Sequence, residues 1–149
     1  MGKPQNILTH EREGQELIEN FPVSFFSHAE AIYHLQEVGI DLKKTRVADW
    51  LQTSRANVSQ VIGRMQNSGL VDFGENLKLT ESGDCLAKIV IRRHRITERF
   101  LSEVLNLPWA DVYKEASKWE NVLSPLTEKA MLEILSLIHI SEPTRRLII

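Results

Sequence analysis

The chain has little of several features that would restrict its function. A single cysteine, Cys85, excludes an internal disulfide and a zinc site made of cysteines alone. No stretch of eighteen uncharged apolar residues occurs, so we expect no membrane span. The first twenty residues lack the basic-then-apolar layout of a secretory signal. These absences predict a cytoplasmic protein.

Neither sign of charge dominates, since 18 Lys and Arg face 20 Asp and Glu, a formal net charge of −2. The charges are unevenly spread, however. Residues 40–100 hold eleven basic and seven acidic residues, a net of +4, while the remainder holds seven and thirteen, a net of −6. A basic middle suits an anionic partner, because the local field matters more than the total charge. Chance clustering of surface charges is the alternative.

Periodicity and turn residues predict several short elements in the first half of the chain. Residues 1–22 are polar, and we expect a mobile arm or one loose helix there. Apolar residues at helical spacing predict a first helix from Ser24 to Gly39. Thr45 is expected to cap a short second helix, and Ser54 a third helix that Gly69 ends.

A small hairpin and more helices are predicted next. Strands at 70–73 and 77–80 flank a Gly-Glu-Asn turn. A long helix then starts at Thr80, and helices at about 110–121 and 124–135 follow. Two helices joined by a tight turn and followed by a two-stranded wing form a winged helix-turn-helix.

The predicted fold class is therefore mainly α with a small β-wing. A winged helix-turn-helix DNA-binding domain is expected over 23–81, and an all-helical dimerisation and metal-binding domain over 82–134.

The third helix is the candidate for reading DNA. Opposite its apolar face lie small and hydrogen-bonding side chains, Gly63 among them. A major groove requires such a face, because donors must reach base edges and small residues permit close approach. A solvated helix face would use the same residue types. The candidate DNA-binding residues are Thr45, Ser54, Arg55, Ala56, Asn57, Ser59, Gln60 and Arg64.

Several segments, in their order and spacing, resemble the diphtheria toxin repressor family, which includes the manganese transport regulators. The segments are Arg46-Val47-Ala48-Asp49-Trp50-Leu51, Val58-Ser59-Gln60, Ser68-Gly69-Leu70-Val71, Arg93-His94-Arg95 and Lys118-Trp119-Glu120. The resemblance covers about residues 30–135. It implies a metal-activated repressor, not an enzyme, that binds a palindromic double-stranded DNA operator as a homodimer.

The resemblance also implies a site for Mn²⁺ or Fe²⁺. Its matching or neighbouring positions are His94, Glu98, Glu120, Asn121, Ser117 and Glu30. His94 and Glu98 lie four residues apart and so share a helix face. One imidazole and several oxygens favour a hard divalent ion over zinc. Ser27, Tyr113, Ser117 and Asn121 depart from the ligands that family members have at these places.

Alternatives remain open at this point. A helical His-x-x-x-Glu pair is usually a solvated ion pair, so a family member that has lost metal control is the main alternative. A winged domain for protein contact is less favoured, because the outward face lacks an aromatic anchor. An enzyme is disfavoured, since there is no phosphate loop and no nucleophile with a placed histidine. His28 and His34 are expected at the surface.

The end of the chain has an unusual sequence. Residues 135–145 read Leu-Ser-Leu-Ile-His-Ile-Ser-Glu-Pro-Thr-Arg, which matches the translation of a transposase-based sequencing adaptor. We therefore expect 135–149 to be a non-native tail and the native frame to end near Ile134 or Leu135. A genuine apolar helix end is the alternative.

Overall fold

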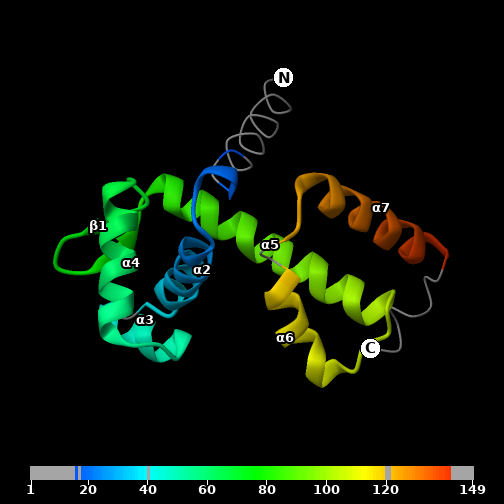
Figure 1. The fold of residues 1–149 in the computed structure, drawn as a ribbon, viewed down its shortest axis with the longest axis horizontal. Helices are drawn as coiled ribbons and strands as arrows, with labels where there is room; N and C mark the ends of the chain where they lie inside the picture. Colours follow the sequence, from blue (N-terminus) through cyan, green and yellow to red (C-terminus); the bar gives the residue numbers. More distant parts are fainter. Residues whose placement is uncertain (1–15, 17, 40, 120–121, 142–149) are drawn as a thin grey trace. The chain divides into compact units, whose positions relative to one another are not determined.

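The computed structural model describes residues 16, 18–39, 41–119 and 122–141 (Figure 1). The chain divides into two compact units: unit 1 ends at Ile91 and unit 2 begins at Arg92. This boundary falls inside a helix and not in a loop. Within the described ranges, no helix is long and apolar enough to cross a membrane.

Unit 1 has the predicted winged helix-turn-helix order. The two strands pair antiparallel, with Val71 opposite Leu79 and Phe73 opposite Leu77, so the predicted hairpin is confirmed. The backbone N–H of Leu77 also donates to the Leu42 carbonyl at 3.0 Å, which attaches the hairpin to the segment before α3. The elements are α2 (Val23–Glu37), α3 (Lys44–Leu51), α4 (Arg55–Asn67), β1 (Val71–Phe73), β2 (Leu77–Leu79) and the start of α5 (Glu81–Glu103).

One apolar core holds these elements together. Each helix and both strands contribute buried side chains, and α4 contributes at the 3.6-residue spacing seen in the sequence. Burial of a large aliphatic side chain stabilises a fold by about 1.5–3 kcal/mol. The largest fully buried apolar members are Ile32, Val47, Val58, Ile62, Met65, Leu70, Val71 and Leu86.

The ends of α4 are as predicted, but the start of α3 is not. The Ser54 hydroxyl accepts a hydrogen bond from the Asn57 N–H at 3.1 Å and caps α4, and Gly69, at φ +75°, follows its end. The expected Thr45 cap is wrong. Helix α3 begins at Lys44 after Lys43, without a side-chain cap, so Thr45 lies in its first turn.

Thr80 joins the end of α4, the wing and the start of α5. Its hydroxyl donates to the Gly69 carbonyl at 2.6 Å and accepts from the Gly83 N–H at 3.1 Å. Its own N–H donates to the Leu70 carbonyl at 3.0 Å. Gly83 packs so closely that a Cβ there would lie 2.0 Å from the Leu70 carbonyl oxygen.

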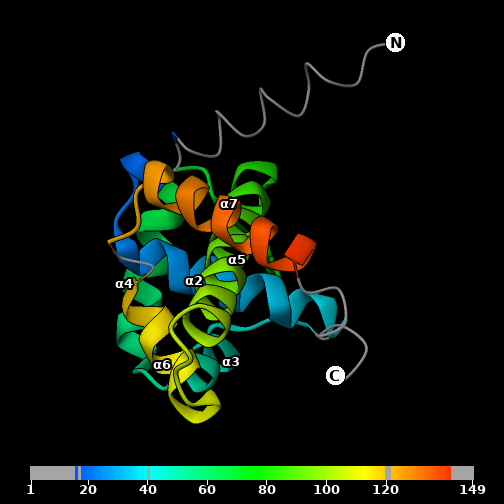
Figure 2. The same cartoon turned by 90° about the vertical axis from the view of Figure 1, so that its right-hand side faces the viewer.

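Unit 2 contains the rest of α5 with α6 (Trp109–Trp119) and α7 (Pro125–Ser141). Figures 1 and 2 both show this part of α5 running between the other two helices. Met131 of α7 packs in one cluster with Ile96, and Val112 of α6 packs in another with Leu101. Helix α7 continues past residue 135 into the expected tail, and a helix there is compatible with either origin of those residues.

The Gly83 contact predicts a large effect of one methyl group. We expect Gly83→Ala to lower the free energy of unfolding by about 3 kcal/mol, because a backbone carbonyl must move to make room. Ser82→Ala, at the exposed neighbouring position, is the control and should stay within about 0.5 kcal/mol of the parent. Thermal and urea unfolding measure both, and equal stability of the two variants would contradict the contact.

Candidate nucleic-acid interface and metal centre

The outward face of α4 gathers the candidate DNA-reading residues. Ala56, Ser59 and Gln60 are exposed, while Val58 and Ile62 on the same helix are buried on the opposite side. Helical geometry places positions 56, 60 and 63 in one row. No large apolar side chain interrupts this row, so donors and acceptors can approach a groove floor.

The first turn of α4 is held by two hydrogen bonds. One is the Ser54 cap, and in the other the Asn57 side-chain amide donates to the Thr53 hydroxyl at 3.0 Å. Arg55 between them is exposed. Thr53 was not a predicted site residue, yet it orients Asn57. Its position four residues before Asn57 could have indicated this contact, because side chains at that spacing lie close together at the start of a helix.

Arg64 turns toward α2. Its guanidinium carbon lies 5.5 Å from the centroid of the Phe25 ring, within cation–π distance, although Arg64 itself is exposed. Phe25 is buried and stacks on Phe21, with ring centroids 5.7 Å apart. Arg64 therefore stands at the flank of the outward face. Phe25 could not be predicted from the sequence as the partner of Arg64, because the contact joins residues far apart along the chain.

Net positive charge lies on the helices, whereas the wing is net negative. Lys78 on β2 stands opposite Asp72 on β1, and Glu75 is exposed in the turn between the strands. The hairpin therefore carries two acidic residues and one basic residue. The half-buried Thr45 lies on α3 beside the exposed Arg46. The basic residues at or on α3 and α4 are Lys43, Lys44, Arg46, Arg55 and Arg64.

His94 and Glu98 are the predicted metal ligands that the structure brings together. His94 Nε2 lies 2.6 Å from Glu98 Oε1 on α5, and the Tyr113 ring packs edge-on against the imidazole at 5.2 Å between centroids. His94 is buried and Glu98 half-buried. A neutral imidazole and a carboxylate are donors that fit Mn²⁺ or Fe²⁺. Their direct contact is also what an ion pair requires.

Two of the remaining predicted ligands lie on other helices. Ser117 lies on α6, where its hydroxyl donates to the Tyr113 carbonyl at 3.0 Å. Glu30 lies on α2 in unit 1, with its Oε1 3.8 Å from His34 Nε2. Glu120 and Asn121 fall outside the described residues. In the part of the chain that the structure describes, no three His, Cys, Asp or Glu side chains form a group that could hold a metal.

His28 is buried, contrary to the expectation of a surface residue. It is 4% exposed, and its Nδ1 donates to the Ser24 carbonyl at 2.8 Å. Nε2 has no hydrogen-bond partner among the described residues. Burial lowers the pKa of His28, although the hydrogen bond opposes this shift. The neutral ring therefore belongs to the core, whereas His34 is half-buried and stacks on the exposed Trp50.

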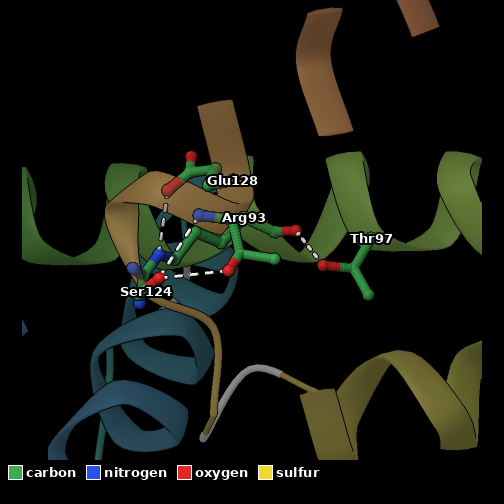
Figure 3. A network of polar contacts seen from close by, with 5 residues as sticks. Arg93, Thr97, Ser124 and Glu128 are labelled. Carbon is green, nitrogen blue, oxygen red and sulfur yellow. Dashed lines mark hydrogen bonds and ion pairs between the residues drawn. The ribbon is translucent and has the colours of Figure 1, made fainter. Parts of the chain in front are cut away.

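A buried ion pair, formed by the residue before His94, attaches α7 to α5 (Figure 3). Arg93 Nε donates to Glu128 Oε2 at 3.0 Å, and the two side chains are 5% and 18% exposed. The Thr97 hydroxyl donates to the Arg93 carbonyl at 2.8 Å. The Ser124 hydroxyl accepts from the Thr127 N–H at 3.2 Å and caps α7, which presents Glu128 in its first turn.

Removing one partner of this pair leaves the other charge buried. We expect Glu128→Ala to cost about 3–5 kcal/mol of unfolding free energy, and the double variant Arg93→Met with Glu128→Leu to recover most of that loss. Urea unfolding measures both. Glu133→Ala, exposed on the same helix, is the control. A double variant as unstable as Glu128→Ala would show that the uncompensated charge is not the cause.

Comparison with known proteins matches both halves of the chain. Residues 80–143 match the family model described as "Iron dependent repressor, metal binding and dimerisation domain". The iron-dependent repressor IdeR of Mycobacterium tuberculosis is 40% identical over 107 residues, which are 70% of this chain and 46% of that protein. The diphtheria toxin repressor of Corynebacterium diphtheriae is 37% identical over 106 residues, or 70% and 47% of the two chains.

The solved structures that resemble this chain are also of metal-dependent regulators. A manganese-dependent transcriptional repressor in complex with manganese superposes with a TM-score of 0.70 at 29% identity, covering 75% of this chain and 52% of the other. The manganese regulator SloR gives 0.69 at 25% identity, covering 75% and 53%. The chain spans about half the length of the curated relatives it matches.

Proposed function

The chain belongs to the diphtheria toxin repressor family of metal-dependent regulators, and from this we propose that it is a metal-responsive transcriptional repressor. In this proposal it binds a palindromic DNA operator as a homodimer and acts in the cytoplasm, where its DNA lies. The observation that carries the proposal is the outward face of α4, polar and free of large apolar side chains on a helix whose other face is buried.

DNA is read by α4 in this proposal. Ser59 and Gln60 meet base edges, Ala56 permits close approach, and Arg55 binds a phosphate at the entrance. Arg64 binds phosphate from the flank, where Phe25 holds its guanidinium. The remaining proposed DNA contacts are Ser54 and Asn57 at the first turn of α4, and Thr45 on α3.

Mn²⁺ or Fe²⁺ is the proposed effector. His94 and Glu98 would hold it, with Glu120, Asn121, the backbone oxygen of Ser117 and Glu30 as the further proposed donors. When bound, the ion supplies a divalent charge shared by nitrogen and oxygen donors. His94 is already oriented for this task, because its ring is enclosed between Glu98 and Tyr113.

DNA binding tests the proposal directly. Duplexes are selected by the full chain from a random library, with and without MnCl₂, and binding of the selected duplex is measured at several salt concentrations. We expect sequence-preferring binding that weakens steeply with salt and strengthens with manganese. His94→Ala should raise the manganese concentration needed by about tenfold or more. Arg95→Gln, exposed and adjacent on α5, is the control.

The outcomes separate the candidates. No sequence-preferring binding under either condition would overturn the regulator proposal itself. Tight binding that is indifferent to manganese and to His94→Ala would instead favour the family member that has lost metal control.

An exposed apolar row on α7 is the proposed dimer contact. Leu126 and Ile134 are 79% and 41% exposed, and Ala130 between them is exposed as well. Their four-residue spacing places them on one face, away from the buried Met131. The matched family model names this region a dimerisation domain, so the occupant we propose for this face is a second copy of the chain.

A charge introduced into an apolar contact should separate the subunits. We expect Leu126→Glu to shift the chain from dimer to monomer in sedimentation equilibrium and to weaken operator binding by at least about tenfold. Lys114→Glu, exposed on α6, should leave the mass unchanged. A Leu126→Glu variant that stays dimeric would place the interface elsewhere.

A further inference from the structure

Gly63 lies in the interior of α4, where the fold gives no reason for a glycine. Glycine weakens a helix interior relative to alanine, because it loses more conformational freedom on folding. Its usual justification is a left-handed backbone or a close neighbour. Gly63 has neither: positive φ among the described glycines occurs at Gly39 and Gly69, and a Cβ at position 63 would have no atom within 4 Å beyond its own stretch of helix.

Gly83 supplies the contrast. It also lies in a helix, but a Cβ there would meet the Leu70 carbonyl, so the fold itself requires that glycine. At Gly63 an alanine would fit the folded chain and stabilise the helix. A cause for its absence therefore has to be sought outside the chain.

Position 63 is next to the side chains proposed to read bases. It follows Ser59 by four residues and Gln60 by three, and residues at these spacings are neighbours on a helix surface. Both of these side chains are exposed and short to medium in length. A side chain at 63 would project from the same outward face beside these two side chains, so glycine lets the helix backbone itself come close to a partner on that face.

We propose that Gly63 is a specificity-determining residue of the DNA interface, because its missing side chain allows α4 to approach the base edges closely enough for Ser59 and Gln60 to reach them. The inference rests on the proposed function. It extends that function by assigning a role to a residue with no donor, acceptor or charge.

Opposite effects on stability and on binding follow from this role. Gly63→Ala should raise the midpoint of thermal unfolding by a few degrees. It should also weaken binding of the selected duplex by about fivefold or more, and Gly63→Leu should weaken it further. Binding to an unselected duplex should change little, since phosphate contacts dominate it. A purely structural role for Gly63 would move stability and affinity in the same direction.

Fluorescence anisotropy with the two duplexes and thermal unfolding measure these effects. Ser82→Ala, exposed on α5 and outside the outward face of α4, is the control and should bind the selected duplex as the parent does. If the parent selects a duplex and Gly63→Ala binds it equally well, this inference is wrong while the proposed function stands. If the parent selects none, the proposed function has failed first.

Discussion

The junction at Thr80 is the constraint on which unit 1 depends. One hydroxyl group accepts a hydrogen bond from the first turn of α5 and donates one to the residue that ends α4, and the same residue's N–H holds the start of β1. The end of α4, the two strands of the wing and the start of α5 thus meet at Thr80. Gly83 allows α5 to lie directly on the Leu70 carbonyl, so the wing, α4 and α5 cannot shift independently.

Local signals in the sequence were sufficient to predict most of the elements in this arrangement. Ser54 and Gly69 delimit α4 because a cap and a left-handed glycine act on their immediate neighbours, and the hairpin follows from alternation around a turn. The prediction that Thr45 caps α3 was wrong. A residue with a hydroxyl group caps a helix only when its own backbone is extended, and the backbone of Thr45 is already helical.

Contacts between segments that are distant along the chain could not be predicted from the sequence. The burial of His28, the position of Arg64 over Phe25 and the pairing of Arg93 with Glu128 each depend on how helices pack. The His94–Glu98 pair was accessible because both residues lie on one helix. The rest of the proposed metal site draws on several segments, so spacing along the chain does not indicate how its donors assemble.

The charge balance of the hairpin has a consequence for how binding responds to ions. Asp72 offsets Lys78 across the strands, and Glu75 adds a negative charge at the turn. In the proposed complex the wing would therefore release few cations from the DNA, and its contribution to affinity would come from fit. The release of condensed cations would come mainly from the basic side chains at α3 and α4, so among the described elements of unit 1 the slope of affinity against salt would report chiefly on those two helices.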